Sequence, residues 1–319
     1  MKNIFENVLF AVSREDHEIE ASLIRKNNYK NLLTVCSGGC VPLSLKTIFP
    51  DLNVVAYDIN PNQIDHCEKK IQAVLRKDVS LLNIGENTEQ SLNQLGRFEE
   101  MLQVLRKSFL KNVTGNQVIK TFFSTNTSKE IRKKISASWI NHKYINTPFQ
   151  DTFNDFMIEK VFGDHATKQG ETGSYVSYFQ KKIMTSFTKE KSQSNPFLQH
   201  IFLGYYKSES AFPYMNFKSS PTIQLFEGNV CDVPNINGFD IISLSNLFDW
   251  NDESFIIRCV RKLSNIKSGS SILLRQLNNH KDWSLFFGEG FIEDKAFDKY
   301  WQEKDRSLFY DHFRLFVKV

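Results

Sequence analysis

Short apolar runs alternate with helical periodicity in the first quarter of the chain. Residues 31–35 (NLLTV) form a run that ends at a glycine loop, residues 37–39 (SGG), and residues 53–57 (NVVAY) form a second run that ends at Asp58. Apolar residues then recur every three or four positions over 61–76, which is typical of one helix face. This order of strand, glycine loop, helix, strand, acidic residue and helix predicts a right-handed βαβα unit.

The same alternation returns in the last third of the chain. We expect strands over 222–227 (TIQLFE), 239–244 (FDIISL) and 270–277 (SSILLRQL), and the apolar spacing over 255–263 predicts a helix between the last two. Together with the first two runs, these segments give five strands that helices connect, as in a parallel sheet.

The final residues contain two apolar stretches around Asp311 and His312. We expect residues 305–310 (DRSLFY) and 312–319 (HFRLFVKV) to form a two-stranded antiparallel hairpin. Five parallel strands and this hairpin predict an α/β fold with a doubly wound, mostly parallel, seven-stranded Rossmann-like sheet.

The segment between the two halves has a different pattern. It contains one strongly amphipathic stretch at 92–109 and further helical stretches at 128–140 and 174–190. We interpret it as a mostly helical insertion that covers the strand ends where ligands bind. The expected parts are residues 1–77, with the first half of the sheet domain; 78–221, the insertion; and 222–319, the second half.

Composition limits the class of protein. Of 319 residues, 41% are hydrophobic and 24% are charged, which suits a folded chain with a sizeable core. A net charge of +4 is too small to indicate a nucleic-acid partner. No apolar run approaches the ~20 residues of a membrane span, and the first twenty residues lack the pattern of a signal peptide. Five cysteines without a CxxC pair indicate reduced thiols and no metal site, so we expect a cytoplasmic protein. The sequence does not indicate an oligomeric state.

Glycine and acidic residues follow three of the expected strands. Ser37, Gly38 and Gly39 form a loop that a ligand can approach closely, Asp58 can accept both hydroxyls of a ribose, and Asp232 can accept an adenine amino group. A dinucleotide site predicts GxGxxG, and SGGCVP lacks the third glycine, so a phosphate-free adenosyl cofactor, S-adenosyl-L-methionine, fits better. A tight turn at the glycines, a helix N-cap at Asp58 and nucleotide binding without methionine are the alternatives.

Eight stretches carry a resemblance to one family. They are REDHEIE (14–20), SGGC (37–40), DINPNQ (58–63), VFGDHAT (161–167), NPFLQHIFLGYY (195–206), LSNLFDW (244–250), LLRQ (273–276) and DRSLFY (305–310). On these stretches the chain resembles the bacterial and fungal S-adenosylmethionine:diacylglycerol 3-amino-3-carboxypropyltransferases, which make the homoserine head group of betaine lipids. LSNLFDW and DRSLFY are the most specific, and His17 stands where the family usually has proline.

The resemblance implies transfer of the 3-amino-3-carboxypropyl group to a lipid hydroxyl, with release of methylthioadenosine. A methyltransferase presents the methyl carbon of the sulfonium, whereas this family is expected to present the γ-carbon of the methionine chain. Orientation must then select one of several similar carbons, and an alcohol acceptor needs a base within hydrogen-bond reach. A diacylglycerol-like acceptor also implies peripheral contact with the inner face of a membrane.

Three residues are candidates for catalysis. Asp249 can accept a proton, Tyr310 can act as a base or a hydrogen-bond donor on the acceptor side, and His165 can act as general base. Each has a structural alternative: helix capping for Asp249, and a buried or capping role for His165. Tyr310 needs a strongly lowered pKa to act as a base, because a tyrosine ordinarily titrates near ~10.

The remaining candidates bind the cofactor or the substrate. Arg275 and Arg306 are candidates to clamp a carboxylate, and Trp250 is a candidate to stack at the site; a structural ion pair for Arg275 and a core position for Trp250 are the alternatives. Arg14 and its neighbours in REDHEIE form either a lid over the cofactor or a solvated charged turn. The expected cofactor-binding residues are Ser37, Gly38, Gly39, Asp58, Asn60, Gln63, Asp232, Val233, Ser245 and Asn246.

Two rival functions are compatible with the same residues. One is an S-adenosylmethionine-dependent methyltransferase of small molecules on the same sheet. The other is a non-catalytic module that binds a lipid or a nucleotide.

Overall fold

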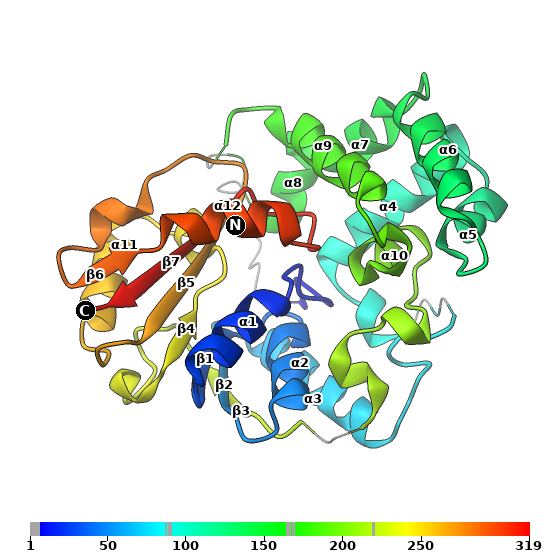
Figure 1. Ribbon diagram of the computed structural model, residues 1–319. Coiled ribbons are helices and arrows are strands. Elements are labelled where there is room, and N and C mark those ends of the chain that lie inside the picture. The colour runs from blue at the N-terminus through cyan, green and yellow to red at the C-terminus, as the bar shows by residue number, and fades with distance from the viewer. Residues whose placement is uncertain (1–6, 87, 89–90, 164–166, 168–169, 219–220) are drawn as a thin grey trace.

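A seven-stranded sheet organises the structure, a computed structural model that describes residues 7–86, 88, 91–163, 167, 170–218 and 221–319. Its strands are β1 (Asn31–Val35), β2 (Asn53–Asp58), β3 (Gln224–Glu227), β4 (Ile241–Ser243), β5 (Ser271–Gln276), β6 (Phe291–Glu293) and β7 (His312–Lys318). Their order across the sheet is β3-β2-β1-β4-β5-β7-β6 (Figure 1). The first five strands are parallel, and β7 is antiparallel to both of its neighbours. The predicted α/β sheet of five parallel strands with an antiparallel addition is therefore confirmed.

Helices cover both faces of this sheet. Those outside the insertion are α1 (Glu18–Asn27), α2 (Cys40–Ile48), α3 (Pro61–Leu75), α11 (Glu253–Leu263) and α12 (Lys295–Lys304). Successive side chains of a strand point to opposite faces. Accordingly, Leu32 of β1 packs in a cluster with α1 and α2, whereas Leu33 packs in a cluster with α11. Both faces of the inner strands are therefore buried, which explains why those parallel strands are mostly apolar, whereas the edge strand β3 has exposed polar ends.

The predicted terminal hairpin is wrong. Residues 305–310 form no strand, and β7 instead pairs with β5 and with β6, which the sequence analysis did not identify. Leu308 has a φ of 72°, which a strand does not tolerate. The carbonyl groups of Phe309 and Tyr310 accept hydrogen bonds from side chains of the insertion rather than from a neighbouring strand. Tertiary contacts therefore override the local apolar pattern.

The segment between α3 and β3 is mostly helical, as predicted. Its helices are α4 (Arg97–Asn112), α5 (Asn116–Phe123), α6 (Lys129–Ile140), α7 (Asn146–Phe153), α8 (Asp155–Phe162), α9 (Ser174–Thr188) and α10 (Pro196–Phe202). Figure 1 shows them gathered beside the sheet. The predicted single helix over 92–109 is divided, because Gly96 is extended between a short 3₁₀ turn and α4. Buried residues of the insertion share one cluster with Leu273 of β5 and Phe313 of β7, so both parts belong to one core.

The aromatic core of the insertion gives a stability prediction. The Phe202 ring is 2% exposed and lies 4.9 Å from the rings of both Phe109 and Phe187. Phe202→Ala should lower the free energy of unfolding by about 3–5 kcal/mol, because it leaves a cavity among large side chains. Phe156→Ala is the matched control, since Phe156 is 73% exposed and should lose less than about 0.5 kcal/mol. Urea unfolding followed by tryptophan fluorescence measures both values, and equal losses would contradict the packing.

Candidate functional site

The candidate site lies at the carboxyl edge of the parallel strands. The strand order reverses between β1 and β4, and open α/β sheets bind ligands in the crevice outside such a reversal. The parallel register pairs Val35 with Tyr57 and Thr34 with Ser243, so the loops after β1, β2 and β4 leave the sheet side by side. The topology therefore brings the glycine loop, Asp58 and the LSNLFDW stretch to one edge.

Asp58 fixes the glycine loop to the start of α3. Its Oδ2 accepts a hydrogen bond from the Ser37 N–H at 2.9 Å, and its Oδ1 accepts one from the Asn60 N–H at 3.0 Å. Burial raises the pKa of Asp58 to about 6, although these hydrogen bonds lower it. Asn60, not Asp58, is the N-cap of α3, since its side chain accepts the Asn62 N–H. The capping alternative for Asp58 is therefore wrong.

The N-terminal strap, residues 7–17, packs against this loop. A Cβ on Gly38 would lie 2.6 Å from the Ser13 nitrogen and 2.7 Å from the Val12 Cα, so the strap requires glycine there. The residue after it, Gly39, has a φ of 76°, which favours glycine for a second reason. Because Arg14, Glu15 and Asp16 are all buried, the strap is not a solvated charged turn.

Two predicted cofactor contacts instead hold the strap. The amide oxygen of Gln63 accepts the N–H groups of Leu9 and Phe10, and its nitrogen donates to the carbonyls of Phe10 and Ser37. All four hydrogen-bonding positions of that amide are thereby used. Asn60 donates from its side-chain nitrogen to the Asn7 carbonyl at 3.0 Å. Both side chains lie at the expected edge, and both already have partners within the chain.

Arg275 forms a buried ion pair with two glutamates. Its Nη1 lies 2.9 Å from Glu20 Oε1 and 3.2 Å from Glu15 Oε2, and its Nη2 lies 3.0 Å from Glu20 Oε2. Glu15 also accepts hydrogen bonds from the hydroxyls of Ser245 and Tyr310. Burial raises the pKa of Glu15, and the neighbouring Arg275 lowers it. Arg275 thus forms a structural ion pair, which was the alternative to a carboxylate clamp.

Arg306 pairs with the strap as well. Its Nε and Nη2 donate to the two carboxylate oxygens of Asp16 at 2.7 and 2.5 Å, in the forked geometry that guanidinium groups favour. Burial alone would raise the pKa of Asp16, but the Arg306 hydrogen bonds hold it below its ordinary value. This carboxylate occupies the fork that was expected to clamp a substrate.

Asp249 is buried behind the loop that follows β5. It lies in a 3₁₀ turn, η8 (Leu247–Trp250), and accepts hydrogen bonds from the Leu277 N–H at 2.9 Å and the Asn279 amide at 2.8 Å. Burial raises its pKa to about 7, although these hydrogen bonds lower it. The N-cap of α11 is Asp252, so Asp249 does not cap that helix. A carboxyl group that titrates near neutral pH can accept or donate a proton there.

A small cavity of about 60 Å³ lies between the sheet edge and the insertion. The strap, α4, α8, α9, the loops after β4 and β5, and the 305–310 segment contribute to its wall. Most of its lining side chains are aromatic or aliphatic, and the polar ones are Arg14, Tyr175, Asn246 and Tyr310. The structure thus brings together Asn246 and Tyr310, which are 64 positions apart in the sequence and were both expected at the site.

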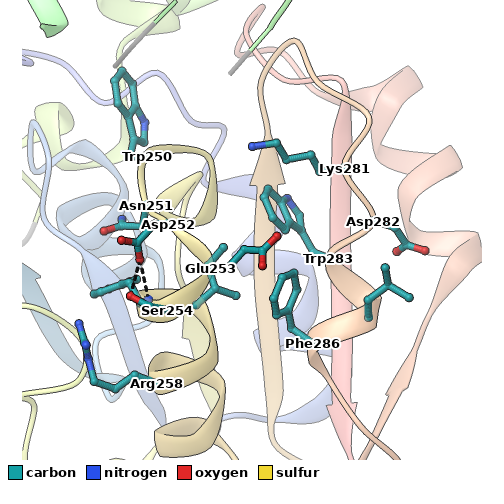
Figure 2. A pocket seen from close by; sticks show the side chains of 13 residues that line it. Trp250, Asn251, Asp252, Glu253, Ser254, Arg258, Lys281, Asp282, Trp283 and Phe286 are labelled. Atoms are coloured by element: carbon teal, nitrogen blue, oxygen red, sulfur yellow. Dashed lines mark hydrogen bonds between the residues drawn. The ribbon is translucent and has the colours of Figure 1, made fainter. Parts of the chain in front are cut away.

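Trp250 connects this cavity to an open groove. The ring of Trp250 is 37% exposed and lies 5.6 Å from the ring of Phe162. It lines both the cavity and a groove of about 880 Å³ between the start of α11 and the 3₁₀ turn at Trp283–Phe286, η9 (Figure 2). A fully buried core position for Trp250 is therefore wrong.

Two further predicted residues lie away from the cavity. The Asp232 carboxylate accepts hydrogen bonds from the backbone and side chain of Asn229 within its own loop, and Val233 is buried in the cluster beneath α11. That loop follows β3, and the Gly228 N–H donates to the Asp58 carbonyl, which keeps the end of β3 next to β2. His165 lies outside the described residues.

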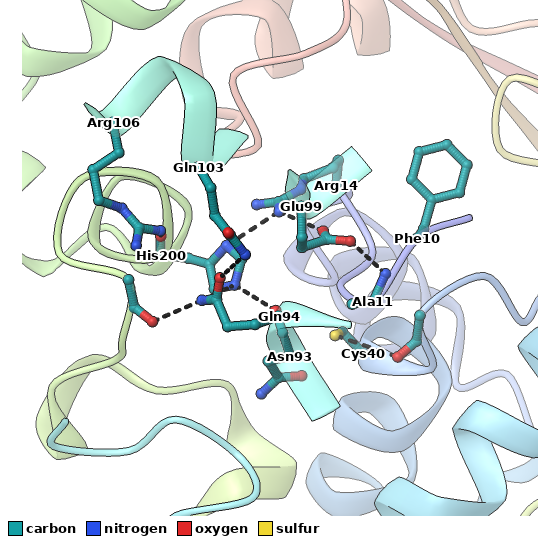
Figure 3. A network of polar contacts seen from close by, with 12 residues as sticks. Phe10, Ala11, Arg14, Cys40, Asn93, Gln94, Glu99, Gln103, Arg106 and His200 are labelled. Carbon is teal, nitrogen blue, oxygen red and sulfur yellow. Dashed lines mark hydrogen bonds and ion pairs between the residues drawn. The ribbon is translucent and has the colours of Figure 1, made fainter. Parts of the chain in front are cut away.

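Two groups that were not predicted from the sequence anchor Arg14. Its Nη2 donates to Glu99 Oε1 at 2.7 Å and contacts His200 Nδ1 at 3.1 Å (Figure 3). Burial and the adjacent Arg14 hold the pKa of His200 well below its ordinary value, so this imidazole is neutral. Glu99 lies on the amphipathic stretch that becomes α4, where one buried carboxylate gives no recognisable signal.

Comparisons with protein-family models, curated proteins and solved structures found no match to this chain. Within the described residues, no group of three or more histidine, cysteine, aspartate or glutamate side chains is placed to hold a metal ion. The helices in the same part of the chain are too short or too polar to cross a bilayer.

The Arg275 ion pair gives a testable prediction about stability. Arg275→Met should lower the free energy of unfolding by about 3–5 kcal/mol, because it leaves two buried glutamates without a cation. Arg25→Met is the control, since the Arg25–Glu18 pair is half exposed and should contribute less than about 1 kcal/mol. Chemical unfolding measures both values. A stable Arg275→Met protein with a raised KM for the cofactor would instead support the clamp.

The pKa of Asp249 predicts a pH effect on stability. A folded-state pKa of about 7, above the ordinary 3.8, means that protonation of Asp249 favours the folded state. This contribution is fully present below about pH 4 and is lost as the pH rises through 7. The unfolding free energy of the wild type relative to Asp249→Asn should therefore fall by up to about 4 kcal/mol across that range. The pKa of Asp252 is lowered below 3.8, so the wild type relative to the Asp252→Asn control should show no change between about pH 4 and 7. A difference between the wild type and Asp249→Asn that is equally constant over this range would contradict the assignment.

Proposed function

We propose that the protein transfers the 3-amino-3-carboxypropyl group of S-adenosyl-L-methionine to the hydroxyl of a diacylglycerol-like lipid. The observation that carries this proposal is the aromatic cavity at the sheet edge, with Asn246 and Tyr310 among its few polar groups. Ligand sites of this kind combine an apolar wall with a small number of polar groups that fix orientation. The doubly wound strand order and the resemblance support the same cofactor class.

The residues at the carboxyl edge fit an adenosyl group. The Asp58 carboxylate accepts the N–H groups of Ser37, Asn60 and Ile59 and has about four lone-pair sites. A remaining site can accept a ribose hydroxyl. The strap covers the side of Gly38 where a Cβ would project, so in this proposal the adenosyl group lies beside Ser37 and Asp58, which are only partly buried. S-adenosyl-L-methionine would supply an electrophilic γ-carbon next to its sulfonium.

Asp249 and Tyr310 divide the proton chemistry in this proposal. Burial and the adjacent Glu15 raise the pKa of Tyr310 well above its ordinary value, so its hydroxyl stays protonated and donates a hydrogen bond. Asp249 has a pKa of about 7 and is bound by the N–H of Leu277, which lines the cavity. In this proposal Asp249, which lies behind Leu277 and does not itself line the cavity, is the proton acceptor, and Tyr310 orients the acceptor hydroxyl.

The size of the cavity limits what part of the acceptor can enter. About 60 Å³ admits only a few atoms. In this proposal the hydroxyl end of the lipid enters, and its acyl chains stay outside, near the groove beside Trp250. Water is excluded by the aromatic wall, which protects the electrophile from hydrolysis.

A cationic groove supports peripheral contact with an anionic membrane surface. It lies between α6 and the loop after α9, with a volume of about 640 Å³. Five cationic side chains and one carboxylate give it a net formal charge of +4, equal to that of the whole chain. Anionic headgroups attract such clusters. The charged side chains are Lys129, Arg132, Lys133, Lys189, Glu190 and Lys191.

The products of the reaction test the proposal. Incubation with S-adenosyl-L-methionine and diacylglycerol in mixed vesicles should yield methylthioadenosine and an ether-linked homoserine lipid, both measured by mass spectrometry. Asp249→Asn should lower turnover at least ~100-fold, which is the usual contribution of a positioned base. Asp252→Asn, at an exposed N-cap that asparagine also fills well, should keep full turnover.

Two other outcomes separate the rival functions. S-adenosylhomocysteine as the product would identify a methyltransferase, which the same sheet edge can support. Binding of the cofactor without turnover on any hydroxylated lipid would identify a non-catalytic module.

A further inference from the structure

Arg14 has donors that the described part of the chain does not satisfy. Arg14 is 4% exposed, and its guanidinium group carries five N–H donors. Nη2 binds Glu99 and His200, whereas Nε and Nη1 have no hydrogen-bond partner among the described residues. A buried donor without a partner destabilises a folded protein. Such groups are therefore uncommon, and an oxygen atom of a bound ligand would supply the missing hydrogen-bond acceptor.

The Arg14 side chain borders the cavity. Arg14 lines the cavity together with Asn246 and Tyr310, and its guanidinium lies 5.6 Å from the centre of the Phe98 ring. Neither Arg275 nor Arg306 lines the cavity. Of the three arginines in this region, Arg14 is thus the one whose side chain faces the enclosed space.

The local charge favours a small anion. Glu99 offers one oxygen to Arg14, while its other oxygen accepts the Ala11 N–H at 2.6 Å. His200 is neutral, so the only charged partner of the Arg14 guanidinium here is the Glu99 carboxylate, which it shares with the backbone N–H of Ala11. In a wall that is otherwise mostly apolar, a carboxylate of a ligand would be held strongly by the remaining donors.

We propose that Arg14 binds the carboxylate of an amino-acid ligand in this cavity. This inference rests on the proposed function, under which the ligand is the amino- and carboxyl-bearing chain of S-adenosyl-L-methionine. Arg14 takes the carboxylate-binding role that the sequence suggested for Arg275 and Arg306, because the guanidinium groups of those two residues already bind glutamate and aspartate side chains. Binding through Arg14 would also tie the strap to the cofactor, since Arg14 lies within it.

Calorimetry with two cofactors tests this assignment. Decarboxylated S-adenosylmethionine lacks only the carboxylate, so comparison of its Kd with that of S-adenosyl-L-methionine isolates the contribution of this group. The wild type should bind the carboxylated cofactor at least about 10-fold more tightly, as expected for a hydrogen bond between charged groups. The Arg14→Gln/Glu99→Gln double variant, which removes both charges together, should bind the two cofactors equally.

Two further variants keep the test decisive. Arg14→Lys preserves the charge next to Glu99 but presents a single point of contact, so it should fold and show reduced discrimination. Arg306→Lys is the control and should retain the wild-type preference. Thermal unfolding confirms that each variant is folded before binding is measured.

The outcomes separate this inference from the proposed function. If the wild type prefers the carboxylated cofactor and both Arg14 variants keep that preference, Arg14 is not the carboxylate ligand, while the proposed cofactor stands. If the wild type binds both cofactors equally, the inference is also overturned. If it binds neither, the proposed function itself fails and the inference fails with it.

Discussion

Buried ion pairs between the N-terminal strap and the rest of the chain hold the site together. Arg14 pairs with Glu99 of α4, Glu15 with Arg275 of β5, and Asp16 with Arg306 of the 305–310 segment. A buried charge is tolerated only when it is paired, so each contact strongly disfavours a strap that lies elsewhere. Three consecutive residues thereby connect the insertion, the sheet and the segment before β7. The cavity exists where these three parts meet.

This arrangement also explains the altered acidity at the site. Asp58, Asp249 and Glu15 lie at the same covered edge, and burial raises the pKa of each. Asp249 has no basic side chain as a hydrogen-bonding partner among the described residues, whereas Asp16 has Arg306, which holds its pKa below the ordinary value. Covering the sheet edge with the strap and the insertion therefore does two things. It reduces contact with water, and it leaves Asp58 and Asp249 with pKa values of about 6 and about 7, close to neutral pH.

The sequence predicted the parts of the fold that depend on local pattern. The runs over 31–35 and 53–57 and the helix from Pro61 were identified because burial on both faces makes parallel strands apolar throughout. The segment 305–310 has a similar composition, but its carbonyls bind α9 and Leu308 adopts a left-handed backbone, so local pattern misassigned it. Asn246 and Tyr310 both line the cavity, and Asp249 accepts the N–H of Leu277 in its wall. The partners of Arg275 and Arg306 depend on how the strap folds back, which no local pattern encodes.

A count of donors and acceptors shows why the three arginines differ. Arg275 pairs with two glutamates and keeps only its Nε without a partner among the described residues, and Arg306 donates to both oxygens of Asp16. Arg14 meets a single oxygen of Glu99, because the other oxygen accepts a backbone N–H of the strap itself. The strap backbone thus occupies one of the two Glu99 oxygens, and only the other is bound to Arg14. A bidentate pair uses two N–H groups of the guanidinium, whereas this shared carboxylate leaves Nε and Nη1 of Arg14 without a partner among the described residues. The same backbone contact that fixes the strap therefore keeps Arg14 available.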